Sequence, residues 1–518
     1  MKKSKIIISI LSIFILFITS IIFSATLYIN ENFANQSVDE MIYYLFNGLD
    51  GTSSDVFINA IGKSLVPFLF LLLLLLLPIM PLRKRSNIIE VTFRGKKITL
   101  TILPNKLFYK FKLFYALFML VLSGVVCYNL LGIKEYYNRL LNYSSIINDN
   151  YVSGTDVSIT FPDKKRNLII LYIESGENTL IDKENGGGWN YSVTPELESI
   201  ALENINFSNS DKIGGALPIV GTGWTVGGLV ATTSGIPLKI PVNGNDYTSS
   251  NNFLAGAYTL GDILHKEGYN QEVMFGSDAD FGGRSNYYIK HGNYEIFDVK
   301  TAISEGKMDE SEHVWWGFDD THLFEWAKEE ITELASLDKP FHFSFLTANT
   351  HFPDGFVESG TENLFETQYE NVFAFSAKQI SDFVTWLKNQ EFYKNTTLII
   401  MGDHHSMQDP DFFTSHMYDG YDRTIYNAII NSPVKPINSK NRLFTSLDMY
   451  PTILASIGVT IEGNRLGLGT NLFSNRKTLV EELGHSYFDE ELAKNSKFYN
   501  ERILRDDYLD LIKKAKNK

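Results

Sequence analysis

Three uncharged apolar stretches within the first 133 residues set the strongest limit on how this chain folds. They cover Ile6–Ile29, Ser64–Leu82 and Leu113–Ile133, and the second contains seven consecutive leucines. Because about 20 apolar residues in a helix cross the hydrocarbon core of a bilayer, we predict three transmembrane helices. The first stretch is longer than the core of a usual cleaved signal and lacks a clear cleavage site, and prolines are tolerated near span ends.

Basic residues flank these stretches unevenly. Lysines stand at positions 2, 3 and 5 before the first stretch, whereas the loop 31–55 contains no Lys or Arg. Nine basic residues follow the second stretch, between Arg83 and Lys112. Because cytoplasmic loops carry an excess of Lys and Arg, we place the amino terminus and the loop 83–112 in the cytoplasm. Three crossings then put everything after Ile133 outside, which predicts a multi-pass membrane protein with a large extracytoplasmic part.

The charge balance reverses after the apolar part of the chain. Residues 1–133 hold 13 Lys and Arg against 6 Asp and Glu, a net charge of +7, and subtracting this from the whole-chain value of −14 leaves −21 for residues 134–518. Nucleic-acid phosphates need clustered cations, so we expect no nucleic-acid partner. The single cysteine, Cys127, lies in the third apolar stretch, so the chain forms no internal disulfide and no thiolate zinc site.

The extracytoplasmic part alternates short apolar runs with helical patterns, which is typical of a parallel sheet covered by helices. The runs expected as strands are Asn167–Ile173, Glu272–Phe275, Phe341–Thr347 and Thr397–Met401, and the stretches expected as helices include Leu260–Glu267, His322–Ser336 and Glu370–Gln390. We therefore predict a membrane domain over 1–133, a juxtamembrane linker over 134–164 and an α/β catalytic domain over 165–518. The Tyr-rich start of the linker fits either an interfacial helix or a plain connection.

Polar residues follow each predicted strand, where ligands bind in sheets of this kind. They are Glu174-Ser175, then Asp278 and Asp280, then Asn349 and His351, and finally Asp403-His404-His405. Oxygen and nitrogen ligands without cysteine favour Mg²⁺ or Mn²⁺, although catalytic zinc with carboxylate and imidazole ligands is also possible. Taken singly, Glu174 could instead cap a helix and residues 403–405 could form a simple turn.

A glycine-rich stretch, Gly214–Leu238, predicts a loop that opens into a helix. A hydroxyl at a helix start lies among free backbone N–H groups, which favour an anion such as phosphate. The alternative is an ordinary threonine N-cap.

In this order, these motifs resemble the lipoteichoic acid synthase and phosphoglycerol transferase group, a membrane-bound branch of the alkaline phosphatase and sulfatase superfamily. The likeness is greatest to the phosphoglycerol transferase I branch, which decorates osmoregulated periplasmic glucans. It extends over about 165–475 and rests on Glu174-Ser175, Gly221–Thr225, Gly235–Leu238, Gly317–Asp320, Thr350–Phe356, Asp403-His404, Asp448–Thr452 and Gly467–Gly469.

The resemblance implies roles for six residues. Glu174, Thr225, Asp403 and His404 match the ligands of one divalent ion, Mn²⁺ or Mg²⁺ rather than Zn²⁺, and Thr225 is also the nucleophile. His351 and Arg284 resemble the groups that hold the phosphate or glycerol, and His351 is a candidate acid and base; the match of Arg284 is looser because its Gly282-Gly283 context differs from the aromatic-rich version of the polymerising synthases. The implied reaction moves phosphoglycerol from phosphatidylglycerol to an extracytoplasmic glycan at the inner membrane of a bacterium. His405 receives no role.

Four other functions compete with this one. A sulfatase needs Cys or Ser followed by x-Pro-x-Arg, which is absent near Thr225. Phosphoethanolamine transferases commonly carry several disulfides, which this chain cannot form. Lipoteichoic acid polymerases typically have five spans, so the three predicted here favour single transfer over chain growth. An inactive membrane sensor or scaffold would bind no metal and release no diacylglycerol.

Overall fold

The computed structural model describes residues 2–32, 38–47, 54–80, 88–93, 96–101, 110–240, 247 and 252–505. The chain forms two compact units, and the boundary between them does not follow the sequence order. One unit comprises Met1–Ala34 with Ser53–Asn138, and the other comprises Asn35–Thr52 with Arg139–Lys518. The second unit therefore includes a short segment that lies, in sequence, between the first two apolar stretches.

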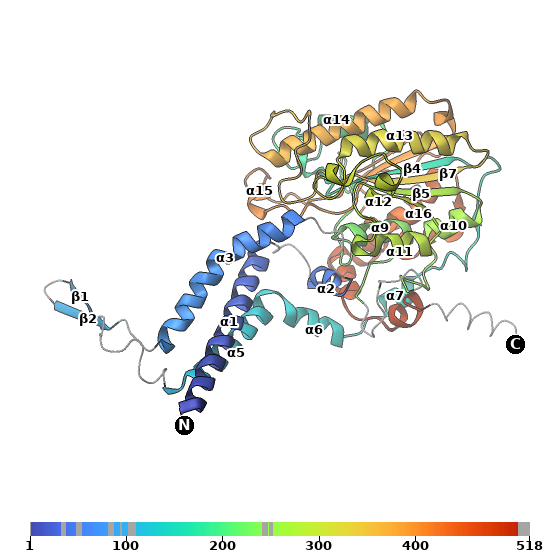
Figure 1. The fold of residues 1–518 in the computed structure, drawn as a ribbon. Helices are drawn as coiled ribbons and strands as arrows, with labels where there is room; N and C mark the ends of the chain where they lie inside the picture. The colour runs from blue at the N-terminus through green and yellow to red at the C-terminus, as the bar shows by residue number, and fades with distance from the viewer. Residues whose placement is uncertain are drawn as a thin grey trace. The chain divides into compact units, whose positions relative to one another are not determined.

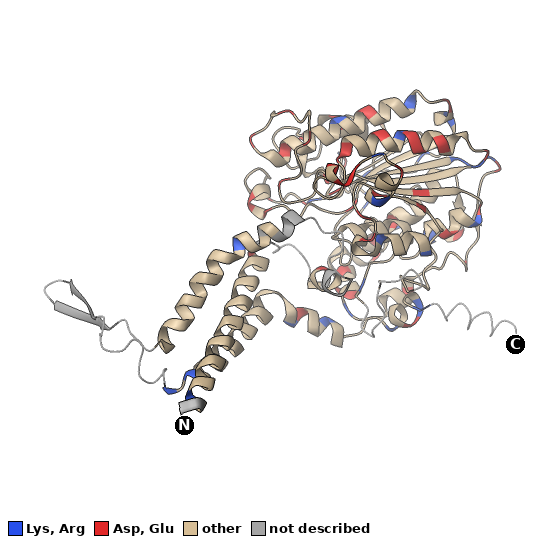
Figure 2. Ribbon diagram, in the orientation of Figure 1, with Lys and Arg blue, Asp and Glu red and all other residues tan. Residues whose placement is uncertain are grey.

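The first unit contains three helices long and apolar enough to cross a membrane: Ser4–Glu31, Ala60–Ile79 and Lys112–Leu130. They belong to α1 (Lys2–Asn32), α3 (Ser54–Leu76, continued by a 3-10 turn, Leu77–Ile79) and α5 (Lys112–Leu130). The helices at the three predicted positions are thus confirmed, and the middles of α1 and α5 carry no charged side chain (Figure 2). An antiparallel hairpin, β1 (Ile88–Phe93) and β2 (Lys96–Thr101), lies between α3 and α5 and was not predicted.

The second unit is built on a six-stranded sheet with the order β6-β5-β7-β4-β8-β9. The strands are β4 (Asn167–Ile173), β5 (Asn270–Phe275), β6 (Glu295–Phe297), β7 (Phe341–Leu346), β8 (Thr396–Gly402) and β9 (Asn427–Ile430). All neighbours pair in parallel except β9, which runs antiparallel to β8. The predicted mixed α/β class with a mostly parallel sheet is therefore confirmed, and β4 in the centre is fully buried because both its faces are covered.

Helices cover both faces of this sheet (Figure 1). Alternate residues of β4, such as Ile169 and Leu171, pack into an apolar core with α8 (Pro195–Glu203), α12 (Val299–Ser304), α13 (Asp320–Ser336) and α14 (Gln368–Lys388). The opposite face carries α9 (Thr225–Ser234), α10 (Leu260–Lys266), α11 (Arg284–Lys290) and α16 (Met449–Ser456). Tyr172 on this face pairs its hydroxyl with that of Thr232 in α9. The sheet is thus the middle layer of three.

The remaining elements are short. The linker region contains α6 (Ile133–Leu141) and α7 (Ile146–Asn150), so it begins with a helix, and its place at the membrane interface stays a prediction. The others are α2 (Val38–Asn47), β3 (Ile159–Thr160), α15 (Pro410–Thr414), β10 (Thr460–Ile461), β11 (Arg465–Leu466), β12 (Gly469–Thr470), α17 (Leu479–Leu483), α18 (His485–Ala493) and a π-helical turn at Tyr499–Ile503.

Candidate metal centre and nucleophile

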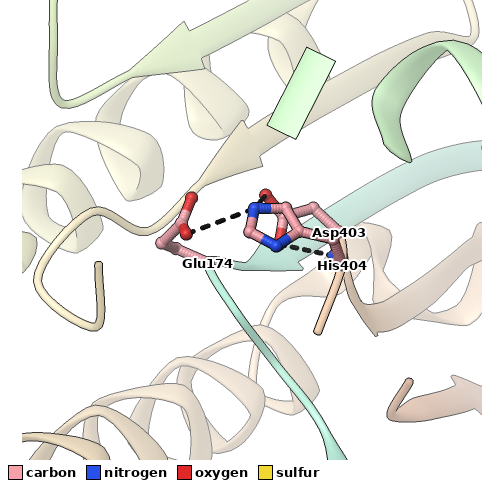
Figure 3. A group of neighbouring side chains, drawn as sticks. All are labelled: Glu174, Asp403 and His404. Carbon is pink, nitrogen blue, oxygen red and sulfur yellow. Dashed lines mark hydrogen bonds and ion pairs between the residues drawn. The ribbon is translucent and has the colours of Figure 1, made fainter. Parts of the chain in front are cut away.

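Two acidic residues meet at the carboxyl edge of the sheet. Glu174 directly follows β4 and Asp403 directly follows β8, and the pairing of Ile173 with Gly402 sets the two strand ends side by side. Together with His404 they offer ligand atoms that all lie within 4.8 Å of one another, and all three side chains are buried (Figure 3). Three of the four predicted metal ligands therefore converge, from segments about 230 residues apart.

Hydrogen bonds fix the orientation of this group. Oδ1 of Asp403 accepts the backbone N–H of Ser175 at 2.9 Å and that of His404 at 2.8 Å. The Nδ1–H of His404 donates to the carbonyl oxygen of His405 at 2.7 Å, which leaves Nε2 directed at the carboxylates. Nε2 lies 3.4 Å from Oε1 of Glu174 and 3.4 Å from Oδ2 of Asp403 (Figure 3).

The fourth predicted ligand, Thr225, is the first residue of α9. Its hydroxyl lies 3.3 Å from Oε2 of Glu174 and 3.4 Å from Nε2 of His404. The N-cap position belongs to Trp224, so the interpretation of Thr225 as an ordinary N-cap is wrong. Gly228 lets this helix start approach closely, because a Cβ there would lie 2.0 Å from the carbonyl oxygen of Asp403. A bulkier residue at that position would push the helix away from the centre.

The electrostatics of the group fit a cation. Burial raises the pKa of Asp403 well above its usual value, and the charge of Glu174 raises it further. Burial also works to raise the pKa of Glu174, but His404 and His351 outweigh it and lower the pKa overall. Oδ2 of Asp403 is buried and has no hydrogen-bond partner among the described residues. A divalent ion would supply the missing partner for that oxygen and offset the repulsion between the two carboxylates.

A partly open cavity lies beside this group. Its walls include Glu174, Thr225, Phe275, Phe281, Arg284, Trp316 and His351. The site therefore combines carboxylate and imidazole groups with an aromatic wall, a combination that suits a ligand with a charged head and a carbon skeleton.

Arg284, at the start of α11, is held rigidly in this cavity. Its guanidinium lies 4.5 Å from the centre of the Phe275 ring and donates to the hydroxyl of Ser277 at 2.9 Å and to the carbonyl oxygen of Asp278 at 2.6 Å. The side chain is only 4% exposed and is already fixed by these contacts. Its charge can therefore bind an anion in the cavity with little further loss of side-chain conformational entropy.

His351 reaches the same cavity from the segment after β7. Its Nδ1–H donates to the carbonyl oxygen of Phe352 at 2.6 Å, and its ring lies 4.9 Å from that of Trp316. Burial lowers the pKa of His351, which favours the neutral imidazole. Trp316 was not proposed as a site residue from the sequence, although it adjoins the Gly317–Asp320 motif.

Two other predicted strand-end groups point away from the centre. Asp278 and Asp280 form ion pairs with Lys300 at 2.9 and 2.6 Å. His405 is not one of the clustered ligands: its burial lowers its pKa to about 4, and the charges that act on it include those of Glu177 and Arg423. Glu177 and Arg423 form a buried ion pair that no sequence signal had indicated, with bonds of 2.7 and 2.6 Å.

The fold and the site together define an α/β protein with one acidic and imidazole centre at the carboxyl edge of its sheet. The chain belongs to the Sulfatase family, whose family model matches residues 166–459. Every residue of the centre lies inside this range.

Named relatives extend the comparison. The chain is 30% identical over 330 residues to phosphoglycerol transferase I of Escherichia coli strain SMS-3-5, and 29% identical to that of E. coli O127:H6 strain E2348/69. Each alignment covers 62% of this chain and 40% of the relative, so the chain matches less than half the length of these proteins.

Two solved structures have a similar arrangement. One is a protein in the alkaline phosphatase superfamily from Vibrio parahaemolyticus, with a TM-score of 0.49 and 21% identity over 65% of this chain and 79% of that chain. The other is the lipoteichoic acid synthase LtaP from Listeria monocytogenes, with a TM-score of 0.48 and 19% identity over 64% of this chain and 82% of that chain.

Proposed function

We propose that this protein is a membrane-bound phosphoglycerol transferase. It moves glycerol phosphate from phosphatidylglycerol to a glycan hydroxyl and releases diacylglycerol. The observation that carries the proposal is the hydroxyl of Thr225, which lies 3.3 Å from Glu174 and 3.4 Å from His404 at the edge of a buried carboxylate pair. The 30% identity to phosphoglycerol transferase I supports the group transferred.

Glu174, Thr225, Asp403 and His404 would hold one divalent ion, Mn²⁺ or Mg²⁺ in preference to Zn²⁺. When bound, such an ion lowers the pKa of the threonine hydroxyl and neutralises charge on the phosphoryl oxygens. The protein supplies the geometry, because the ligand side chains are buried and the carboxylate of Asp403 is held by two backbone N–H groups.

The transfer proceeds in two steps. Oγ1 of Thr225 attacks the phosphorus of phosphatidylglycerol, the bond to the diacylglycerol oxygen breaks, and a glycerophospho-threonine remains. A sugar hydroxyl then attacks this phosphorus and restores the free threonine. The neutral imidazole of His351 takes the proton of the Thr225 hydroxyl and passes it to the leaving alkoxide. In the second step it takes the proton of the sugar hydroxyl and returns it to Oγ1 of Thr225, while Arg284 offsets the charge that develops on the phosphoryl group in both steps.

The membrane helices fit this donor. Phosphatidylglycerol stays in the leaflet, so an enzyme anchored by spans meets it at a high local concentration. The uneven distribution of basic residues supports a catalytic unit outside the cytoplasm, at the inner membrane of a bacterium. An extracytoplasmic glycan is then the accessible acceptor.

The test uses the full chain in lipid nanodiscs with phosphatidylglycerol labelled in its headgroup glycerol. Wild-type protein with Mn²⁺ should release diacylglycerol and carry glycerol phosphate on Thr225, detected by mass analysis of the peptide. Thr225→Ala should lose both, whereas Thr222→Ala, which removes the hydroxyl of a threonine in the loop before the helix, is the matched control. Diacylglycerol release by Thr225→Ala would exclude the assigned nucleophile.

A further inference from the structure

Helix α2 belongs to the second compact unit, which carries the candidate site and is called the catalytic unit below, although α2 lies, in sequence, between the first two membrane spans. The catalytic unit includes Asn35–Thr52, and α2 covers Val38–Asn47 within it. The chain therefore leaves the span Ser4–Glu31, contributes α2 to the catalytic unit, and then enters the span Ala60–Ile79. The contacts of α2 show which part of that unit it touches.

Among the α2 side chains that the structure describes, Tyr43 is the most deeply buried. It is fully buried, and its ring lies 5.7 Å from that of Trp224 and 5.8 Å from that of Tyr247. Its hydroxyl donates to the carbonyl oxygen of Gly282. Trp224 immediately precedes the nucleophile proposed above, and Gly282 stands two residues before Arg284, so one side chain contacts both segments that carry reacting groups.

Glu40 adds a second point of contact, one helical turn before Tyr43. Its side chain is only 2% exposed. Burial raises the pKa of Glu40, and the negative charge of Glu174 raises it further. The pKa of Tyr43 is raised chiefly by burial, and the nearby charge of Arg284 lowers it in part.

The position of Trp224 depends on packing. Its indole Nε1 is buried and has no hydrogen-bond partner among the described residues. One side of the ring lies over Gly227, where an added Cβ would come within 3.2 Å of it, and Tyr43 packs against the ring as well. Trp224 is also the N-cap residue of α9, with extended backbone angles and no side-chain cap. A shift of its indole is therefore transmitted directly to Thr225.

The segment before Arg284 needs a similar support. Gly282 and Gly283 both adopt left-handed backbone angles, with φ of 64° and 75°. Two such residues in succession are flexible in the unfolded chain and lose much conformational entropy on folding. The bond from Tyr43 to the carbonyl of Gly282 fixes this turn from one side, and Arg284 follows it into the cavity.

We propose that Tyr43 is a positioning residue of the catalytic site, supplied by the loop between the first two membrane spans. It keeps Trp224 and the Gly282–Arg284 turn in place, so that the hydroxyl of Thr225 and the guanidinium of Arg284 face the same phosphoryl group. This inference rests on the proposed function. It adds that the catalytic geometry is completed by a segment that lies, in sequence, between two membrane spans.

The test compares Tyr43→Ala and Tyr43→Phe with Tyr487→Ala and Tyr487→Phe, matched changes at a tyrosine that is 53% exposed. All are made in the full chain in nanodiscs of phosphatidylglycerol with Mn²⁺. Diacylglycerol release gives kcat and KM, and the midpoint of thermal unfolding is measured with and without Mn²⁺. Cleavage of bis(4-nitrophenyl) phosphate, a small diester, serves as a second substrate.

A misplacement of about 1 Å at a reacting group costs roughly 100-fold in rate. Tyr43→Ala should therefore lower kcat by about 10- to 100-fold on both substrates while KM changes less than threefold. Tyr43→Phe keeps the ring that packs on Trp224 but loses the bond to Gly282, so its kcat should lie measurably below that of wild type and above that of Tyr43→Ala. The rise in unfolding midpoint with Mn²⁺ should persist in both, because the metal ligands are untouched. The Tyr487 variants should match wild type.

Equal kcat for Tyr43→Ala and Tyr487→Ala would overturn the inference, as would a loss confined to KM for the lipid. If Tyr43→Ala does not fold, Tyr43→Phe decides alone: a lowered kcat at an unchanged unfolding midpoint supports the positioning role, and an unchanged kcat excludes it. Failure of the wild type to release diacylglycerol would count against the proposed function instead. In that case cleavage of the small diester still tests Tyr43.

Discussion

The hydroxyl of Thr225 lies 3.3 Å from Oε2 of Glu174, although 51 residues separate them in the chain. One residue starts helix α9 and the other follows the central strand β4, so the contact depends on how closely the helix start approaches the sheet. Gly228 permits this approach by leaving room for the carbonyl oxygen of Asp403. The centre is thus assembled from three separate segments, and each can be tested by itself.

A divalent ion should stabilise the protein through Asp403. At a concentration about 100 times its dissociation constant, Mn²⁺ should add roughly 2.7 kcal/mol to the free energy of unfolding, because it binds only the folded centre. A chelator should abolish diacylglycerol release, and added Mn²⁺ should restore it. Asp403→Asn should lose most of the stabilisation, because a neutral amide is a weak ligand. Thermal unfolding with and without Mn²⁺ measures this effect.

Asp382→Asn, an exposed change on α14, is the control for charge loss and should keep the full response to Mn²⁺. An equal response in Asp403→Asn would show that the ion binds elsewhere.

Replacing Arg284 by lysine should damage catalysis nearly as much as replacing it by alanine. The guanidinium lies over Phe275 and makes three hydrogen bonds, at 3.1, 2.9 and 2.6 Å, and a lysine cannot reproduce this arrangement. Loss of one preorganised donor to a developing charge costs roughly 100- to 1,000-fold, so kcat/KM should fall in that range for both variants. Arg476→Lys, at an exposed arginine, should leave the steady-state kinetics unchanged. Activity of Arg284→Lys within threefold of wild type would contradict the role.

The sheet could be predicted from sequence because its central strands are buried on both faces. A continuous apolar run as short as Asn167–Ile173 is typical of such a strand, and β4 begins and ends at the predicted residues. The edge strand β9 was missed because its four residues, Asn427–Ile430, are too few to stand out. Helix α14 starts two residues before its predicted beginning, because the cap at Thr367 precedes the apolar pattern.

The site was predictable to the extent that strand ends determine it. Glu174 and Asp403 meet because β4 and β8 are parallel neighbours. The same reasoning also predicted Asp278 and Asp280 as site residues, but they form ion pairs with Lys300. Polar residues follow a strand both at a binding site and at a surface turn, so their presence alone does not identify a site. The place of α2 could not be inferred, because nothing in the local sequence of a loop between two spans indicates which distant surface it packs against.

The buried pair Glu177–Arg423 should support both stability and activity. The carboxylate of Glu177 is 1% exposed and also accepts a hydrogen bond from the backbone N–H of Ser406. Glu177 therefore holds the segment that follows Asp403. Removing one partner leaves a buried charge, and Glu177→Gln should cost roughly 3–5 kcal/mol of unfolding free energy. The kcat should fall as well, because His404 lies in the segment released. Denaturant unfolding in detergent and diacylglycerol release measure the two effects.

The pair Arg442–Glu481, with a bond of 2.8 Å, is the matched control. Breaking it by Glu481→Gln should lower stability without a change in kcat at temperatures where the protein stays folded. A lowered kcat in both variants would mean that stability alone explains the loss.

His342, in the middle of β7, should make the protein less stable as the pH falls. Burial lowers its pKa from 6.5 to about 3, and both ring nitrogens have partners at neutral pH, the hydroxyls of Tyr294 at 3.0 Å and Ser344 at 2.9 Å. The native state thus holds a neutral ring, while the unfolded chain binds a proton below pH 6.5. This contribution to stability is complete above pH 6.5 and is lost between pH 6.5 and 3, by about 1.4 kcal/mol per pH unit.

Many carboxylates titrate over the lower part of this range, so the measurement compares slopes between variants. The free energy of unfolding in denaturant is determined between about pH 7.5 and 5 for wild type, His342→Gln and the exposed control His313→Gln. Gln cannot be protonated, so the decline of stability below about pH 6.5 should be shallower in His342→Gln by about 1.4 kcal/mol per pH unit. His313→Gln should follow wild type, because the side chain of His313 is exposed. Parallel curves for all three proteins would mean that the ring of His342 is protonated in the folded sheet, which its two hydroxyl partners and its burial argue against.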